Sequence, residues 1–316
     1  MLYKILLLPA RIFIHFYCRK IIINDDSNLK RPGPLLIAAN HPNSFLDAII
    51  IATLFNNPVY SLTRGDVFRS STVKKILQSL HMLPVYRISE GAENLEHNYS
   101  TFAACQDIFR KKGIVLIFSE GHCINEWHLR ALKKGTARIA LNAWQHEMPL
   151  DVLPLGINYS SFRKFGKTLI LNFGTVITRD QIDGELANGK TLLEFNHVLR
   201  RRLQPLVVEI GAHDLDKRRR TFYFQQPPWA KMALFLPAAA GALLHVPLYL
   251  PAHLLLRNRA NDHYDSIMVG LLFFAYPLYV IFLSLLIFAV THHLAALWLL
   301  AVIPFTGWSW VQWRKD

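Results

Sequence analysis

The sequence predicts an α/β domain, with a mostly buried central sheet flanked by helices, followed by an all-helical membrane segment. Short apolar runs alternate with helical patterns over about two thirds of the 316 residues, which is typical of a sheet covered by helices. The last third has two long stretches, 232–256 and 266–313, without Asp, Glu, Lys or Arg. Apolar stretches longer than about 18 residues are candidate membrane helices, so the chain divides near residue 228.

Short apolar runs bounded by turn residues are predicted to be strands. They lie at 35–39, 59–62, 82–86, 114–118, 152–157 and 169–173. Segments with helical spacing lie between them, and we expect helices at 44–54, 72–80, 94–110, 135–145 and 192–210. Together these elements form an expected domain over residues 23–215, which a basic linker at 216–228 joins to a membrane region at 229–316.

Residues 1–22 combine apolar side chains with Arg11, Arg19 and Lys20, and no small-residue cleavage site follows the short apolar run. We interpret this segment as an amphipathic helix in the membrane interface. The alternative is a helix packed on the domain.

The stretch 232–256 contains three prolines, which make a straight spanning helix unfavourable. We therefore expect a helical hairpin there that enters and leaves on the same side, followed by two spans at about 266–289 and 294–313. In this arrangement all basic flanks stay on the cytoplasmic side, as the positive-inside rule requires. Three full passes are the alternative. We expect the domain on the cytoplasmic face of the inner membrane.

The formal net charge is +13, and 30 of the 35 Lys and Arg residues precede residue 229. Beside a membrane segment, such a charge favours anionic lipid headgroups as a partner, and we expect no nucleic acid. The three cysteines, Cys18, Cys105 and Cys123, form no CxxC pair. The sequence therefore predicts neither a disulfide framework nor a metal site.

Residues 40–47 read Asn-His-Pro-Asn-Ser-Phe-Leu-Asp and follow the first predicted strand at its carboxyl end, where ligand sites of α/β sheets gather. Six residues turn about 600° on an ideal helix, so His41 and Asp47 cannot face each other within one helix. They can pair if His41 lies in a loop that Pro42 folds back, where Asp47 would orient the imidazole. The alternative is a capping box of Ser44 and Asp47.

Three further segments follow in order: Met-Leu-Pro-Val-Tyr-Arg at 82–87, Phe-Ser-Glu-Gly at 118–121 and Val-Leu-Pro-Leu-Gly-Ile at 152–157. Arg87 is suited to a phosphate, because a guanidinium donates two parallel hydrogen bonds; a surface ion pair is its alternative. Glu120 also follows a strand and could simply cap a helix. Gly121 would let the backbone approach a ligand closely.

Together the four segments resemble the motifs of the glycerophospholipid acyltransferases, the glycerol-3-phosphate and lysophosphatidate acyltransferase superfamily, over roughly residues 1–215. Most members have four residues between the motif His and Asp. The five residues here are similar to a branch that includes fungal dual-substrate glycerol-3-phosphate/dihydroxyacetone-phosphate enzymes. The resemblance implies that His41 and Asp47 are catalytic. It implies that the substrate is bound by Asn40, Asn43, Arg87, Glu120 and Gly121.

The family pattern is not complete. Ser119 replaces a usual Pro, and His122 and Cys123 replace residues that often include a basic phosphate contact. Basic residues just downstream could substitute, although a solvated helix face is their alternative. They are Arg130, Lys133, Lys134 and Arg138.

The implied function is a membrane-bound O-acyltransferase of phospholipid synthesis, which moves a fatty acyl group from an acyl thioester to a hydroxyl of glycerol-3-phosphate or a related glycerophosphate. His41 would be the general base, and loop 40–44 with the helix start would supply oxyanion donors. Acyl-CoA or the acyl thioester of acyl carrier protein would be the cosubstrate, and no cofactor is expected. The alternatives are lysophosphatidate or an aminolipid as acceptor, and a non-catalytic membrane lipid-binding protein.

Overall fold

A computed structural model describes residues 2–86, 97–184, 189–211, 213–258 and 261–314. Within them, one sheet is formed by β1 (Cys18–Ile23), β2 (Leu35–Ala39), β3 (Val59–Arg64), β4 (Met82–Val85), β5 (Ile114–Phe118), β6 (Asp151–Tyr159) and β7 (Lys167–Phe173). The order across the sheet is β1-β7-β6-β2-β5-β3-β4, and neighbours are parallel except β6 and β7. The carboxyl ends of β2 to β6 therefore meet at one edge.

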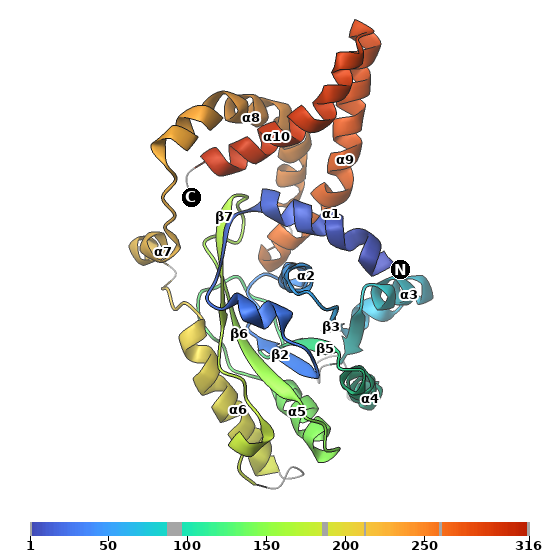
Figure 1. Cartoon of the computed structure of the whole chain (residues 1–316), viewed down its shortest axis with the longest axis vertical. Helices are drawn as coiled ribbons and strands as arrows, with labels where there is room; N and C mark the ends of the chain where they lie inside the picture. The colour runs from blue at the N-terminus through green and yellow to red at the C-terminus, as the bar shows by residue number, and fades with distance from the viewer. Residues whose placement is uncertain (1, 87–96, 185–188, 212, 259–260, 315–316) are drawn as a thin grey trace.

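Helices cover both faces of this sheet, which confirms the predicted α/β fold class (Figure 1). One face is packed by α1 (Leu2–Tyr17) and α2 (Phe45–Leu54). The other is packed by α4 (His97–Arg110), α5 (Gly135–Gln145) and α6 (Gly189–Leu203). Two smaller helices lie at the periphery, α3 (Ser71–Ser79) and α7 (Leu215–Phe222). Helix α7 occupies part of the segment expected as a linker.

Strand β2 lies in the middle of the sheet and is buried on both sides. Leu35, Ile37 and Ala39 belong to the core beneath α2, whereas Leu36 and Ala38 belong to the opposite core. This division follows from the alternation of side chains along a strand, and it explains the unbroken apolar run. Because β2 pairs in parallel with both β5 and β6, the loop after Ala39 leaves from the centre of the carboxyl edge.

Strands β2 and β5 and helix α5 have the predicted bounds. The helix predicted at 192–210 ends at Leu203, because the following turn contains Pro205, which cannot continue a helix. The start of the helix predicted at 94–110 lies outside the described residues.

The amino-terminal helix is shorter than predicted, since it ends at Tyr17 and Cys18–Ile23 form the edge strand β1. Ile5, Leu8 and Ile12 form an exposed apolar stripe at helical spacing along α1. The opposite side of α1 packs on α2. Contact of the stripe with a membrane interface stays a prediction.

Residues 232–256 lie within a single helix, α8 (Pro228–Leu256), and this corrects the expected hairpin. Helix α8 contains three prolines and bends between its halves (Figure 1), because an internal proline kinks a helix without having to end it. It packs along α10 (Leu299–Trp313). Gly241 permits this approach, since a Cβ there would lie 2.1 Å from the carbonyl oxygen of Thr306.

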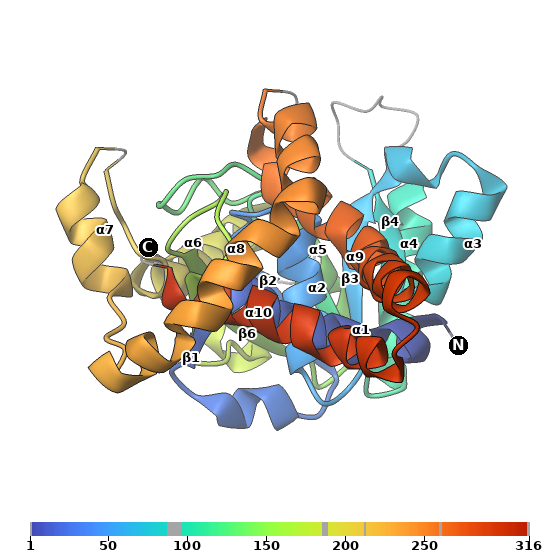
Figure 2. The same ribbon diagram turned by 90° about the horizontal axis from the view of Figure 1, so that it is seen from above.

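Helix α9 (Tyr264–Thr291) connects the apolar region to the domain. Its amino end lies beside the amino end of α2, and the helix extends away from the sheet (Figures 1 and 2). Helix α8, residues 261–291 and residues 294–313 are each long and apolar enough to cross a membrane. The number of passes and the side on which the domain lies stay predictions.

Candidate active site

The loop between β2 and α2 brings His41 and Asp47 together. His41 Nδ1 lies 2.9 Å from Asp47 Oδ2. The His41 side chain is 16% exposed, whereas that of Asp47 is fully buried in the first turn of α2. His41 thus lies off the helix, and the loop closes the six-residue separation that a single helix could not. The ring stacks on Phe118, at the end of β5, with 3.8 Å between centroids.

The capping box of Ser44 and Asp47 does not form. Ser44 has no side-chain capping bond, and Asp47 Oδ2 accepts the amide of Asn43 at 2.9 Å as well as contacting His41. Ser44 also has a φ of 54° and a ψ of −146°. Such a conformation costs a non-glycine residue about 1–3 kcal/mol and persists only where surrounding contacts enforce it.

Tyr159, at the carboxyl end of β6, holds the other side of the same carboxylate. Its hydroxyl donates to Asp47 Oδ1 at 2.7 Å, and the side chain is fully buried. Burial, followed by the negative charge of Asp47, raises the pKa of Tyr159 well above its ordinary value. The phenol therefore stays protonated and acts as a permanent donor to Asp47.

Glu120 lies beside His41 but uses both carboxylate oxygens within the protein. Oε2 accepts the His41 amide at 3.0 Å, and Oε1 accepts the Arg130 amide at 2.9 Å. The Arg130 guanidinium is 3.7 Å from the same carboxylate. Gly121 follows with a φ of 70°, and a Cβ there would lie 3.0 Å from Lys133 Cγ. Glu120 therefore ties the His41 loop to the segment after β5.

The two asparagines of the motif are buried and have protein partners. Asn40 donates to the carbonyl of Ile157 and accepts its amide, so it joins the loop to β6. Asn43 donates to Tyr17 and Asp265 behind the loop. Their predicted contact with substrate stays a prediction, which this burial does not favour. Arg87 lies outside the described residues.

The backbone amides expected as oxyanion donors have acceptors of their own. The His41 amide donates to Glu120, the Asn43 amide to Asp47 and the Ser44 amide to Cys123 Sγ. This corrects the expectation for these three groups. The loop is folded back so tightly that carboxylate and sulfur atoms of nearby side chains accept its backbone N–H groups.

Behind the loop lies a buried polar network that the sequence analysis missed. Lys167 donates to Asp265 and to the Tyr17 hydroxyl, and Tyr17 donates to Asp265 at 2.5 Å. Lys167 is completely buried, and burial lowers its pKa although Asp265 opposes the shift. A signal was present, because Lys167 begins an apolar strand and Asp265 is the last acidic residue before an uncharged stretch.

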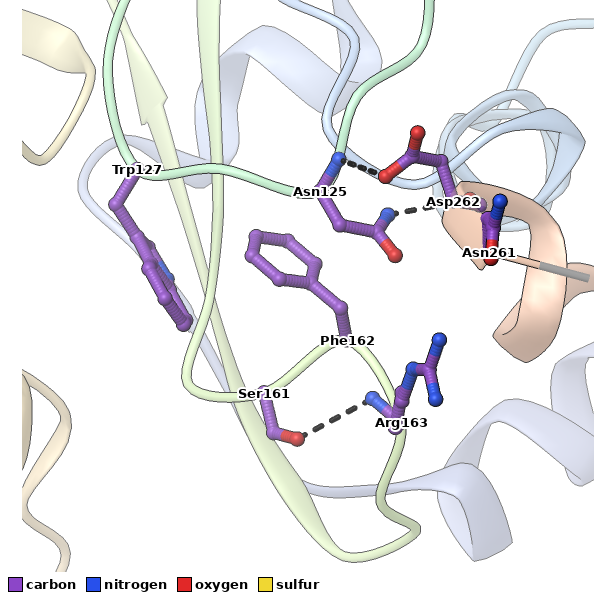
Figure 3. A pocket seen from close by; sticks show the side chains of 7 residues that line it. All are labelled: Asn125, Trp127, Ser161, Phe162, Arg163, Asn261 and Asp262. Atoms are coloured by element: carbon purple, nitrogen blue, oxygen red, sulfur yellow. Dashed lines mark hydrogen bonds between the residues drawn. The ribbon is translucent and has the colours of Figure 1, made fainter. Parts of the chain in front are cut away.

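One cavity of about 540 Å³ opens beside the site (Figure 3). It is lined by Asn125, Trp127, Ser161, Phe162, Arg163, Asn261 and Asp262. Its link to the His41 loop is Asn125, which donates to the carbonyl of Pro42 at 2.7 Å. His41, Asp47 and Glu120 do not line it, so we do not place the reaction there. Among the described residues, no group of three His, Cys, Asp or Glu side chains is placed to hold a metal ion.

The fold is α/β, and the His41–Asp47 pair lies at the carboxyl edge of its sheet. Residues 20–158 match the family model described as Acyltransferase. This match agrees with the resemblance to the glycerophospholipid acyltransferases that the four motifs carry.

A stretch of 121 residues is 31% identical to Glycerol-3-phosphate O-acyltransferase 2 of Saccharomyces cerevisiae, and it covers 38% of this chain and 16% of the yeast protein. The crystal structure of the 1-acyl-sn-glycerophosphate (LPA) acyltransferase PlsC from Thermotoga maritima aligns with a TM-score of 0.45 and 10% identity. That alignment covers 71% of this chain and 83% of the other.

Proposed function

We propose that this protein is a membrane-bound O-acyltransferase, which transfers a fatty acyl group from an acyl thioester to a hydroxyl of glycerol-3-phosphate or a related glycerophosphate. The observation that carries the proposal is the 2.9 Å contact between His41 Nδ1 and the buried Asp47. It leaves Nε2 as the basic nitrogen, and within the described chain Nε2 has no hydrogen-bond partner. The activity in the yeast relative's name supports glycerol-3-phosphate as the acceptor.

In the proposed mechanism, His41 Nε2 removes the proton of the acceptor hydroxyl as that oxygen attacks the thioester carbonyl. The tetrahedral intermediate then loses the thiolate by cleavage of its C–S bond, and His41 returns the proton to the sulfur. Asp47 stabilises the imidazolium that exists between these steps. No covalent acyl-enzyme and no cofactor are required, and the free thiol carrier is coenzyme A or acyl carrier protein.

A phosphorylated acceptor requires cations close to His41. Lys133 is exposed, and its side chain packs against Gly121, the residue after Glu120. Its ammonium group is therefore carried by the segment that follows β5, on which Glu120 also lies. We propose Lys133 and Arg87 as phosphate contacts, Arg87 on the sequence motif alone. Arg130 is a poorer choice, since it already contacts Glu120 and Glu126.

The protein is proposed to act at the cytoplasmic face of the inner membrane. The positive charge of the domain would attract anionic lipids, and the apolar stripe of α1 would enter the interface. Both interactions would hold the domain at the membrane surface, where the apolar acyl chain of the product can enter the lipid.

The test uses purified full-length protein in detergent, with acyl-CoA and the acyl thioester of acyl carrier protein as donors and glycerol-3-phosphate, lysophosphatidate and an aminolipid as acceptors. We expect thioester consumption that depends on glycerol-3-phosphate and falls about 10²–10⁴-fold in His41→Ala. His128→Ala is the matched control, because His128 is an exposed histidine whose ring nitrogen pairs with Glu126 rather than with the His41 loop. Full activity of His41→Ala would refute the catalytic assignment.

The acceptor is tested separately with Arg87→Ala and Lys133→Ala. Each should raise the KM for a phosphorylated acceptor more than it lowers kcat, because a phosphate contact made in ground and transition states affects binding uniformly. If both variants keep the wild-type KM and the protein acylates the aminolipid, the acceptor is a non-phosphate lipid and the proposed glycerophosphate is wrong.

A further inference from the structure

The first turn of α9 is hydrogen-bonded to the backbone of the His41 loop. Ser266 Oγ donates to the carbonyl of Asn43 at 2.9 Å and accepts the Leu46 amide at 3.3 Å. Ser266 is fully buried, so this hydroxyl bridges both sides of the loop-to-helix junction without water. The junction therefore depends on a side chain that lies 223 residues further along the chain.

The residue preceding α9 contacts the strained position of the same loop. His263 Nδ1 lies 2.8 Å from Ser44 Oγ, and the Ser44 amide donates to Cys123 Sγ. Ser44 has a φ of 54°, which a serine adopts only when neighbouring groups enforce it. His263 is one of these groups.

Asp262 is connected to the loop through Asn125, and Figure 3 shows the contacts between these two residues. Its carboxylate accepts the Asn125 amide at 3.0 Å, and its carbonyl accepts Asn125 Nδ2 at 3.2 Å. The same Nδ2 donates to the carbonyl of Pro42 at 2.7 Å. Asn125 thus connects the segment before α9 with the residue that directly follows His41.

Asp265 completes the set from beneath. Its Oδ2 accepts Asn43 Nδ2 at 3.1 Å, and the same oxygen is bound by Lys167 and Tyr17. The carboxylate therefore joins α9, α1, β7 and the His41 loop at one buried point. Lys167 of β7 and Tyr17 of α1 fix its position, so it is a rigid support for Asn43.

We propose that Asp262, His263, Asp265 and Ser266, named here the α9 clamp, position the His41 loop for catalysis. The apolar carboxyl-terminal region is then a support of the active site as well as an anchor. These residues act through the loop and do not touch the reacting atoms. The inference rests on the proposed function, because its catalytic consequence requires His41 to be the base.

The first test is Ser266→Ala in the full-length protein in detergent. We expect kcat to fall about 10- to 100-fold, since small displacements of a catalytic group have effects of this size, while both KM values change by less than about twofold. Ser284→Ala is the matched control, because Ser284 is a buried serine of α9 whose hydroxyl bonds to Val280 of its own helix. Equal kcat in the two variants would overturn the proposal.

A second pair of variants excludes a simple loss of folding. His263 is exposed, so His263→Ala should keep the wild-type thermal midpoint while kcat falls. His263→Asn should recover kcat, because an Asn amide can reach a partner near the position of Nδ1. If kcat neither falls in His263→Ala nor differs between the two variants, His263 is not part of the clamp.

Amide hydrogen exchange of a peptide covering residues 40–47 tests the clamp without any activity. Ser266→Ala should accelerate exchange there, whereas Ser284→Ala should not. Accelerated exchange in a protein without thioester consumption would contradict only the proposed function. Unchanged exchange in an active protein would contradict only the clamp.

Discussion

The Tyr159 hydroxyl donates to Asp47 Oδ1 at 2.7 Å, while His41 Nδ1 contacts Oδ2 of the same carboxylate at 2.9 Å. Asp47 is therefore held from both sides, by a strand end and by the loop that it orients. Such a support fixes the plane of the carboxylate, and through it the direction in which His41 Nε2 points.

Tyr159→Phe should lower kcat about 10- to 100-fold, because a hydrogen bond to a charged group contributes about 1.5–3 kcal/mol and tenfold corresponds to about 1.4 kcal/mol. Both KM values should stay close to those of the wild type. Steady-state kinetics measure the effect, with Tyr99→Phe as the control because Tyr99 is exposed. Wild-type kcat in Tyr159→Phe would show that Asp47 needs no second support.

Glu120→Gln distinguishes a structural from a substrate-binding role. The amide has one accepting oxygen, so it cannot accept both the His41 and Arg130 amides as the carboxylate does. We expect a lower kcat and a lower thermal midpoint, with a smaller change in the KM for the acceptor. The surface variant Glu194→Gln is the control. A raised acceptor KM at unchanged kcat and midpoint would instead indicate direct contact with the substrate.

The buried pair of Lys167 and Asp265 should be sensitive to the loss of one partner. Asp265→Leu leaves the Lys167 charge buried, and such changes cost about 3–5 kcal/mol of folding stability. The double variant Lys167→Met with Asp265→Leu should be more stable than Asp265→Leu alone, because no unpaired charge remains. Thermal midpoints in detergent provide the comparison. Equal midpoints of single and double variants would argue against a coupled ion pair.

Cys123 should react slowly with thiol reagents at neutral pH. Burial, and next the charge of Asp47, raise the pKa of Cys123 from 9.0 to about 12. The reactive thiolate is therefore favoured only as the pH approaches 12, and the alkylation rate should rise about tenfold per pH unit between pH 7 and 10. Mass spectrometry of the modified peptide follows this rate. A plateau near pH 9 would mean that the thiol ionises as in an open loop.

The local pattern of apolar residues was sufficient to predict the central strands and the loop between β2 and α2. The strand at Leu35–Ala39 is an uninterrupted apolar run, and helix geometry placed His41 off α2. It was insufficient for β1, where Arg19 and Lys20 interrupt the pattern in Cys18–Ile23. An edge strand buries only part of each side chain, so its sequence carries a weaker signal.

The supports of the site were beyond prediction because their partners are distant in the chain. Asn40 bonds to Ile157, and Asn43 bonds to Asp265. No spacing rule connects such positions, and the family motif names the asparagines without their partners. The two charges that share a buried site, Lys167 and Asp265, were each visible in the sequence as a charged residue beside an apolar run.

The contacts of β1 and of the His41 loop join residues that are synthesised far apart in time. Ile21 pairs with Leu169 of β7, and Asn43 meets Ser266 only 223 residues after it. At about 5–20 residues per second, a ribosome needs tens of seconds between the first and last of these partners. We therefore expect the nascent chain to carry His41 and Asp47 long before their loop is held in place. The proposed acyl transfer would therefore begin only after α9 has been synthesised and has reached its own position.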